Sequence, residues 1–156
     1  MKTGSLLIIN GDLTDPQTVD MLTFHQTTAH AMTPPGFAFA LDLTGLQAPD
    51  ISFYAAWDGD VLKGIGALRE LDAGHGEIKS MHSHREHRGT GVGKAMLAHL
   101  IGVARERGYA RLSLETGSQD YFTPAHALYA CAGFADCGPF GEYRPSPYNK
   151  FMSMEL

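Results

Sequence analysis

The chain has 156 residues, of which 44% are hydrophobic and 19% are charged, and it carries a formal net charge of −5. This length and composition predict one globular domain over residues 1–156 and exclude a disordered chain. The net charge disfavours nucleic acid as the main partner, and no apolar run approaches the roughly 18 residues that a membrane-spanning helix needs.

The hydrophobic patterns, and the breakers between them, predict an alternation of strands and helices. In chain order we expect a strand at residues 6–9, a helix at 16–32, strands at 51–57, 61–71 and 77–83, a helix at 92–106, a strand at 110–115, a helix at 124–132, and closing strands at 134–140 and 151–156. Asp15-Pro16 supplies an N-cap and a first-turn proline for the first helix, and Pro34-Pro35-Gly36 ends it. Asp58-Gly59 is typical of a hairpin turn, and Gly108 ends the second helix. Residues 37–50 are ambiguous, with a short helical piece as one interpretation. The order of elements is that of an α/β fold with a mixed sheet.

A glycine-rich turn connects the predicted strand at 77–83 to the helix that follows it. The turn reads Arg88-Gly89-Thr90-Gly91-Val92-Gly93-Lys94, with a basic residue at each end. Glycines at this place let backbone N–H groups converge without obstruction by a Cβ atom. The N-terminus of the helix adds unpaired N–H donors and a partial positive charge. The turn is therefore predicted to bind an anion, and a phosphate or pyrophosphate is the expected one.

The spacing of this turn differs from that of two common phosphate-binding motifs. A Walker P-loop has Gly five residues before its Gly-Lys pair and Ser or Thr after the lysine, whereas this chain has Arg88 and Ala95 at those positions. In a dinucleotide-binding fingerprint the third glycine follows the second by three residues, but Gly93 follows Gly91 by two. Taken alone, the glycines are also compatible with a turn that binds nothing.

Two signatures together resemble a known family. The pattern Arg-x-x-Gly-x-Gly that begins at Arg88 resembles the acyl-CoA pyrophosphate loop of the GNAT superfamily of N-acetyltransferases. The second signature of that family, Leu-Tyr followed by Gly-Phe, resembles residues 127–134, which read Ala-Leu-Tyr-Ala-Cys-Ala-Gly-Phe. Residues 76–81 and 138–145 are similar to a group of small bacterial acetyltransferases. The resemblance implies the GNAT acyl-CoA N-acyltransferase fold, a central mixed β-sheet with flanking helices, and acetyl-CoA as the cosubstrate.

The resemblance also implies a set of cofactor-binding residues. In the family, N–H groups of the loop bind the pyrophosphate, and side chains at its ends, here Arg88 and Lys94, add positive charge. The pantetheine arm pairs with the strand before the loop, which implicates backbone atoms of Met81 and Ser83, and the next strand splays away to leave a gap for the thioester. The expected cofactor-binding residues are Met81, Ser83, Arg88, Gly89, Thr90, Gly91, Val92, Gly93 and Lys94.

Tyr129 is the expected general acid. In the family the tyrosine of the Leu-Tyr signature lies near the thioester sulfur and protonates the leaving thiolate. A tyrosine pKa near 10 is close to that of an alkyl thiol, so this proton transfer is expected to be roughly balanced. The alternative is a core tyrosine that packs beside Leu128.

Glu77 is the first candidate for the general base. Glu77, Lys79 and Met81 alternate along the predicted strand, so they are expected to share one face. Polar side chains on a buried strand are costly unless they meet solvent or a ligand. In the family this strand borders the acceptor pocket, which makes Glu77 a base or an amine-orienting carboxylate. An ion pair of Glu77 with Lys79 at a sheet edge is the alternative, and Glu115 at the end of the following strand is a second candidate base.

The histidines and cysteines suggest other kinds of chemistry. His82, His84 and His87 suggest a metal site, but no cysteine lies near them and the glycine turn assigns this segment to phosphate, so no metal is expected. Cys131 suggests a covalent acyl-enzyme, but a small packed thiol is the preferred interpretation. Cys131 and Cys137 do not make a disulfide framework and the N-terminus resembles no secretory signal, so a cytoplasmic location is expected.

These observations predict an acetyl-CoA-dependent N-acetyltransferase that transfers an acetyl group to a primary amine directly, within a ternary complex. The acceptor is expected to be a small-molecule or peptide amine, with neither nucleic acid nor a membrane as partner. The alternative class is a non-catalytic acyl-CoA or nucleotide sensor, which would need the loop but not Tyr129. A metal-binding protein is a third class, and a homodimer that pairs through the last strands, as in many members of the family, is left open.

Overall fold

The computed structural model describes residues 6–83 and 91–156. Its strands are β1 (Leu7–Asn10), β2 (Ile51–Asp58), β3 (Val61–Asp72), β4 (His75–Ser83), β5 (Arg111–Gly117), β6 (Ala135–Cys137) and β7 (Asn149–Glu155). Its helices are α1 (Pro16–Met32), α2 (Leu43–Leu46), α3 (Val92–Glu106), the 3-10 turn η2 (Asp120–Phe122) and α4 (Thr123–Ala132). None of these helices, within the described ranges, is long and apolar enough to cross a bilayer. The predicted order of elements is confirmed, and the ambiguous stretch contains α2.

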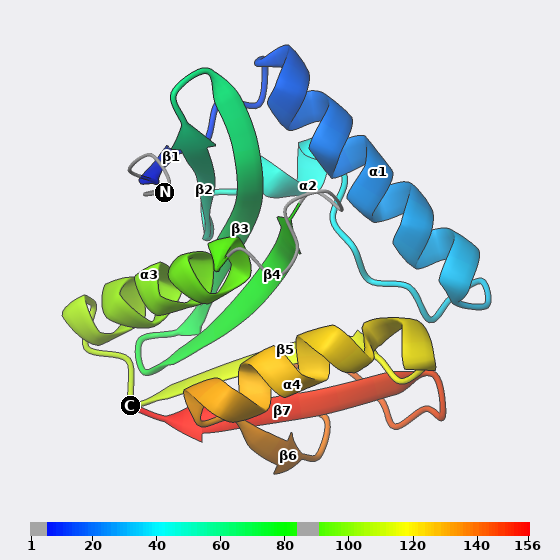
Figure 1. Ribbon diagram of the computed structural model, residues 1–156. Helices are drawn as coiled ribbons and strands as arrows, with labels where there is room; N and C mark the ends of the chain where they lie inside the picture. The colour runs from blue at the N-terminus through cyan, green and yellow to red at the C-terminus, as the bar shows by residue number, and fades with distance from the viewer. Residues whose placement is uncertain (1–5, 84–90) are drawn as a thin grey trace.

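The strands form one mixed sheet (Figure 1). Within the described residues the sheet has seven strands in the order β1-β2-β3-β4-β5-β7-β6. Neighbouring strands pair antiparallel except β4 and β5, which are parallel. A parallel pair needs a crossover connection, and α3 supplies it. The predicted fold class, a mixed sheet with flanking helices, is confirmed.

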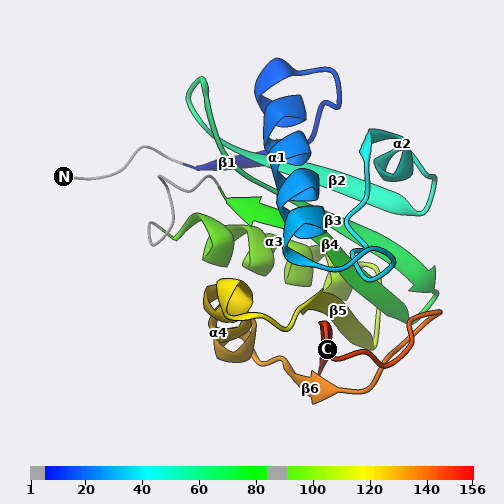
Figure 2. The same ribbon diagram turned by 90° about the vertical axis from the view of Figure 1, so that its right-hand side faces the viewer.

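Helices cover both faces of this sheet (Figure 2). Alternation along β2 sends Tyr54 and Ala56 to one face and Phe53 and Ala55 to the other. The first face packs against α3 and α4, where Leu100 is fully buried, and the second face packs against α1 and α2. A polar side chain on a central strand is therefore buried unless a cavity reaches it.

Two glycines on β3 set the position of α3. A Cβ atom on Gly66 would lie 2.8 Å from Cγ of Met96, and one on Gly64 would lie 2.7 Å from a methyl group of Val92. Side chains at these two positions would therefore push the helix away from the sheet. Because α3 can approach β3 so closely, its first turn lies beside the end of β4.

The closing strand β6 is shorter than predicted. The sequence predicted a strand over residues 134–140, whereas β6 ends at Cys137. The chain from 138 to 148 contains Pro139, Pro145 and Pro147, which have no N–H group to donate to a β-ladder. This irregular segment brings Tyr143 to the central strands, where it becomes part of the site described next.

Candidate active site

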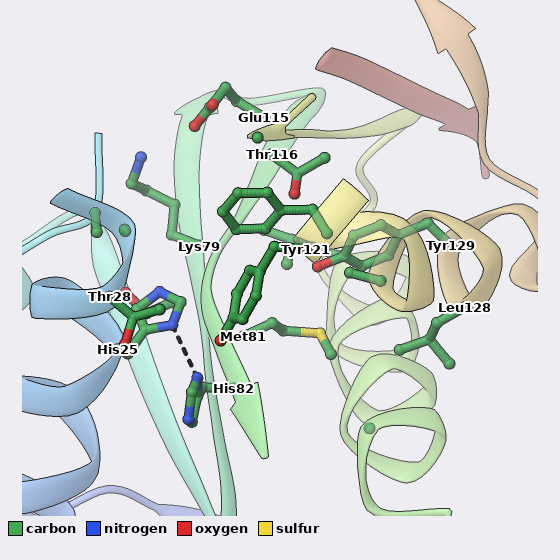
Figure 3. Close-up of a pocket in the computed structure, with 18 of the residues that line it drawn as sticks. His25, Thr28, Lys79, Met81, His82, Glu115, Thr116, Tyr121, Leu128 and Tyr129 are labelled. Carbon is green, nitrogen blue, oxygen red and sulfur yellow. Dashed lines mark hydrogen bonds between the residues drawn. The ribbon is translucent and has the colours of Figure 1, made fainter. Parts of the chain in front are cut away.

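The parallel strands β4 and β5 separate in the middle of the sheet. Their pairing runs from His75 with Arg111 to Ile78 with Leu114 and stops there, although both strands continue. Beyond this point the two strands diverge and face a common cavity (Figure 3). The separation of the strands expected from the sequence is confirmed.

A β-bulge lies on β4 at this opening. The pairing of β4 with β3 shifts between Lys79 and His82, where β4 has one residue more than β3. Ser80 has a φ of 53°, a left-handed conformation that costs a non-glycine residue roughly 1–2 kcal/mol. Strain of this kind persists where the surrounding structure imposes it, and it is common at functional sites.

The bulge changes the facing of Met81. The sequence predicted that Glu77, Lys79 and Met81 share one face of the strand. Instead, Met81 packs with Ile78 against the cluster on the α3 side, while Lys79 contacts Glu77 on the opposite face. The prediction was wrong for Met81, because the extra residue reverses the alternation of side chains after Lys79.

A cavity of about 440 Å³ fills the opening between the two strands. Its wall is formed by α1, the segment 33–40, the end of β4, the start of α3, the end of β5, and α4 with η2. The close-up in Figure 3 shows side chains from α1 and from α4 facing each other across the end of β4. The cavity therefore connects the N-terminus of α3 with the middle of the sheet.

One end of the cavity is the N-terminus of α3. Gly91, Gly93 and Lys94 line it, and Gly91 is the N-cap residue with a φ of 88°. Among the described residues no side chain caps this terminus, and a Cβ on Gly91 would meet no protein atom within 4 Å. The first-turn N–H groups thus have no side-chain cap within the described ranges, as an anion-binding helix terminus requires. The expected loop residues 88–90 lie outside the described part of the chain.

Tyr129 lies on the cavity wall, where α4 faces the end of β5 (Figure 3). The residue is 7% exposed, and its ring packs edge-on against Phe134 with the centroids 5.9 Å apart. Burial raises the pKa of Tyr129 to about 12, and the charge of Glu115 adds to the rise. This pKa is higher than the ordinary value assumed in the sequence analysis. The hydroxyl is therefore fully protonated at neutral pH and available as a proton donor.

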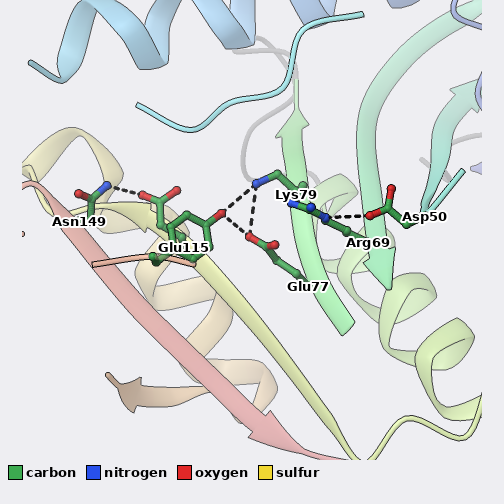
Figure 4. Close-up of polar contacts among 7 residues, drawn as sticks. Asp50, Arg69, Glu77, Lys79, Glu115 and Asn149 are labelled. Atoms are coloured by element: carbon green, nitrogen blue, oxygen red, sulfur yellow. Dashed lines mark hydrogen bonds and ion pairs between the residues drawn. The ribbon is translucent and has the colours of Figure 1, made fainter. Parts of the chain in front are cut away.

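Glu77 and Lys79 lie side by side (Figure 4), and both form hydrogen bonds with Tyr143. Lys79 Nζ lies 3.3 Å from Oε2 of Glu77 and donates to the Tyr143 hydroxyl at 2.9 Å, and this hydroxyl donates in turn to the same oxygen of Glu77. Burial and the charge of Glu77 raise the pKa of Tyr143, so it stays protonated. Glu77 is 1% exposed, and it does not line the cavity, whereas Lys79 does. The ion pair considered above exists, but on a central strand rather than at a sheet edge.

Glu115 lines the cavity one position beyond the last β4–β5 pair. Its Oε2 accepts a hydrogen bond of 2.7 Å from the side-chain amide of Asn149, which also donates to the Phe37 carbonyl oxygen at 2.9 Å (Figure 4). Burial raises the pKa of Glu115, and the hydrogen bond from Asn149 and the charge of Lys79 oppose this rise. A carboxylate with a raised pKa accepts a proton more readily, so Glu115 is suited to act as a general base.

The family-level comparison agrees with this geometry. The sequence profile of the Acetyltransferase (GNAT) family matches residues 19–134. The chain belongs to the GNAT family. It is similar to the uncharacterised N-acetyltransferase YsnE of Bacillus subtilis (strain 168), with 48% identity over 93% of this chain and 96% of that protein. It is also similar to the uncharacterised N-acetyltransferase YedL of Escherichia coli (strain K12), with 43% identity over 93% of this chain and 91% of that protein.

A solved structure shares the fold of this GNAT protein. The crystal structure of a GNAT family acetyltransferase from Elizabethkingia anophelis with acetyl-CoA bound has a TM-score of 0.72 and 19% identity, and the match covers 97% of this chain and 98% of that chain. At this identity the likeness concerns the fold alone. With the family profile and the two curated relatives, the prediction of an acetyltransferase is confirmed.

The structure of this GNAT acetyltransferase adds a histidine pair that the sequence did not suggest. Nδ1 of His25 on α1 lies 3.2 Å from Nδ1 of His82 on β4 (Figure 3). One of these two nitrogens is protonated and donates the hydrogen bond, and the other accepts it. Sequence reasoning grouped His82 with His84 and His87 and overlooked His25, because only the fold brings α1 against β4. His84 and His87 lie outside the described residues. In the described ranges no three His, Cys, Asp or Glu side chains are grouped as metal ligands.

The two cysteines lie away from this chemistry. Cys131 and Cys137 are free and exposed, so the prediction of a packed thiol at Cys131 was wrong. Tyr129 is the buried residue of α4. Cys131 follows it by two positions, so its side chain points away from the helix face that packs against the sheet. Cys131 does not line the cavity, and its position gives a covalent acyl-enzyme no support.

The histidine pair leads to a prediction about stability. Burial lowers the pKa of His25 from 6.5 to about 4, and the positive charge of Lys79 adds to this effect. Between these two pKa values His25 binds more protons in the unfolded chain than in the folded one. Its contribution to the free energy of unfolding is therefore fully present above pH 6.5 and is lost as the pH falls toward 4. We expect this loss to be about 2 kcal/mol. The value is smaller than the full pKa shift would give, because water partly screens the half-buried ring.

His25→Asn should remove this part of the pH dependence. Urea unfolding of the parent and the variant across the pH range between the two pKa values measures it. The two free energies of unfolding should converge as the pH falls, because the variant has no imidazole to protonate. Curves that stay parallel over the whole range would show that burial of His25 does not affect acid stability.

Proposed function

We propose that this GNAT acetyltransferase transfers the acetyl group of acetyl-CoA directly to a primary amine, within a ternary complex. The observation that carries the proposal is one continuous cavity, which has a helix N-terminus suited to an anion at one end and both Tyr129 and Glu115 on its wall. The negative net charge of the chain suits a cationic amine better than nucleic acid. The two exposed free thiols are consistent with the reducing cytoplasm, which we propose as its location.

The cosubstrate site is proposed at the α3 end of the cavity. N–H groups of the first turn of α3 would hold the pyrophosphate, with the charge of Lys94 beside them. In the described part of the chain, β4 has no strand partner on the β5 side after Ile78, so backbone groups near Met81 and Ser83 are available to a pantetheine arm. The proposed cofactor-binding residues are Met81, Ser83, Arg88, Gly89, Thr90, Gly91, Val92, Gly93 and Lys94, of which residues 88–90 lie outside the described part of the chain.

The chemistry requires one proton acceptor and one proton donor. As the amine nitrogen bonds to the thioester carbonyl carbon and the carbon–sulfur bond breaks, a base takes a proton from the nitrogen and Tyr129 gives a proton to the sulfur. We propose Glu115 as the base, because it lines the cavity and its charge reaches Tyr129. Glu77, the base preferred on the sequence alone, does not line the cavity and stands behind Lys79. We therefore propose that Glu77 holds Lys79 in place.

Two measurements test the proposed function. Calorimetric titration should show binding of acetyl-CoA, and a panel of primary amines should give release of free CoA thiol that depends on both substrates. Binding without thiol release for any amine would favour a non-catalytic sensor. Absence of acetyl-CoA binding would contradict the cofactor assignment.

Gly91→Val tests the cosubstrate site at one residue. The left-handed φ of Gly91 is unfavourable for a β-branched residue, and the new methyl groups would occupy the open space before the helix terminus. We expect acetyl-CoA affinity to fall by about 30-fold or more, equivalent to roughly 2 kcal/mol, in a protein that still unfolds cooperatively. Gly102→Ala is the matched control, since this glycine lies inside α3 with open space around its Cβ position. Unchanged affinity in a folded Gly91→Val protein would place the pyrophosphate elsewhere.

A further inference from the structure

Lys79 is a buried cation that the proposed proton transfers do not use. It is 8% exposed, it lines the cavity, and its ammonium group has three N–H donors. Two of them are engaged, with Glu77 and with the Tyr143 hydroxyl. A buried ion pair seldom stabilises a fold more than apolar side chains of the same volume. Among the described residues no acceptor engages the third donor, which is therefore available to a ligand in the cavity.

The arrangement of the pair directs positive charge into the cavity. Glu77 is almost fully buried and lies behind the wall, while Lys79 forms part of the wall. Tyr143 donates to the carboxylate of Glu77 and so stabilises its negative charge behind the wall. The positive charge of Lys79 acts as far as α1, since it helps to lower the pKa of His25. A ligand in the cavity thus meets the positive end of a dipole.

Aromatic residues and Glu115 complete this part of the wall. Phe37 and Phe39, both in the segment 33–40, line the cavity. Phe39 packs edge-on against Tyr143 with the ring centroids 5.1 Å apart. Asn149 joins the backbone of Phe37 to the carboxylate of Glu115. Figures 3 and 4 show the end groups of Lys79 and Glu115 turned toward the same region. One region of the cavity therefore offers a cation, a carboxylate and an aromatic border.

We propose that the acceptor is an amine that also carries a carboxylate, namely a free amino acid, whose carboxylate binds Lys79 and whose amine faces Glu115. This inference rests on the proposed function and adds the class of acceptor to it. A dicationic amine or a lysine-rich peptide would place a positive charge against Lys79, and the cost of that contact disfavours such acceptors. The aromatic border suits an aromatic side chain, which makes phenylalanine the probe of choice.

The first test compares two acceptors on the unaltered protein. Phenylalanine and 2-phenylethylamine differ by the carboxylate alone, and thiol release gives kcat/KM for each. We expect phenylalanine to be better by roughly 10- to 100-fold, the range for a hydrogen bond to a charged group. An equal or higher kcat/KM for 2-phenylethylamine would overturn the proposal.

The second test assigns the preference to Lys79. Lys79→Gln should lower the ratio of kcat/KM for phenylalanine to kcat/KM for 2-phenylethylamine by the same roughly 10- to 100-fold. The ratio is the readout because the charge of Lys79 also lowers the pKa of Glu115, so its loss acts on the turnover of both acceptors. Lys150→Gln is the control, because this lysine pairs with Asp136 outside the cavity. A preference for phenylalanine that persists in a folded Lys79→Gln protein would overturn the assignment.

Direct binding separates this proposal from the proposed function. N-acetylphenylalanine and N-acetyl-2-phenylethylamine are titrated calorimetrically into the protein, which requires no turnover. We expect the compound with the carboxylate to bind about 10-fold more tightly or better. If acetyl-CoA neither binds nor reacts, the proposed function fails, while this titration still decides the carboxylate site. Equal affinities for the two compounds would overturn the site even in an active enzyme.

Discussion

Tyr129→Phe is expected to lower kcat by about 10²-fold or more and to leave the affinity for acetyl-CoA unchanged. The substitution removes one hydroxyl and keeps the ring that packs against Phe134. Because burial holds the pKa of Tyr129 at about 12, the hydroxyl is protonated throughout the neutral range, and the loss should be nearly independent of pH there. The thiolate would then have to take its proton from water. The measurement is kcat by thiol release, with a denaturant melt and an acetyl-CoA titration on the same preparation.

A matched control separates this role from a general effect of losing a hydroxyl. Tyr148→Phe removes a hydroxyl from a residue that packs against Phe37 and does not line the cavity, and it should keep the parent's kcat. If Tyr129 is a core residue only, the result inverts. Stability then falls by roughly 1 kcal/mol and kcat stays within about twofold of the parent. Parent-like turnover in Tyr129→Phe would remove the general-acid role.

The regular elements of the fold were predictable because their signals are local. Asp15 caps α1 by accepting a hydrogen bond from the N–H of Thr18, and Pro16 begins the helix, as the sequence predicted. Gly108 has a φ of 80° at the end of α3, the conformation that makes glycine common there. Alternation and helical spacing gave the strands and helices to within a few residues. Each of these signals involves neighbours in the sequence.

The surroundings of Lys79 and His25 in the cavity were not predictable because their contacts are not local. Lys79 meets Tyr143 across 64 positions of the chain, and His25 meets His82 across 57. No periodicity reports such contacts, so sequence reasoning saw Lys79 as the partner of Glu77 alone. The prediction of the strand face that Met81 occupies was wrong for a different reason. A bulge needs no distinctive residue, and Ser80 adopts its left-handed conformation without the glycine that would have indicated it.

A comparison of Glu115→Gln with Glu77→Gln decides which carboxylate is the base. Glu115→Gln keeps the hydrogen-bonding shape beside Asn149 but cannot accept a proton, so kcat/KM should fall by about 10²- to 10⁴-fold near neutral pH. Burial raises the pKa of Glu115 above the ordinary 4.5, so the acid limb of the parent's profile should lie above that value and should be lost in this variant. The loss should shrink at high pH, where the free amine no longer needs a base.

Glu77→Gln is expected to act mainly on stability. It leaves the ammonium group of Lys79 without its carboxylate in the interior, at a cost of roughly 3 kcal/mol in the free energy of unfolding. Adding Lys79→Met removes the unpaired charge and should recover part of that loss. With 2-phenylethylamine as the acceptor, which does not need Lys79, kcat of a folded Glu77→Gln protein should stay within about tenfold of the parent and keep its acid limb. If Glu77→Gln instead shows the large pH-dependent loss while Glu115→Gln retains activity, the base is Glu77, and the proton must then reach it past Lys79 and Tyr143.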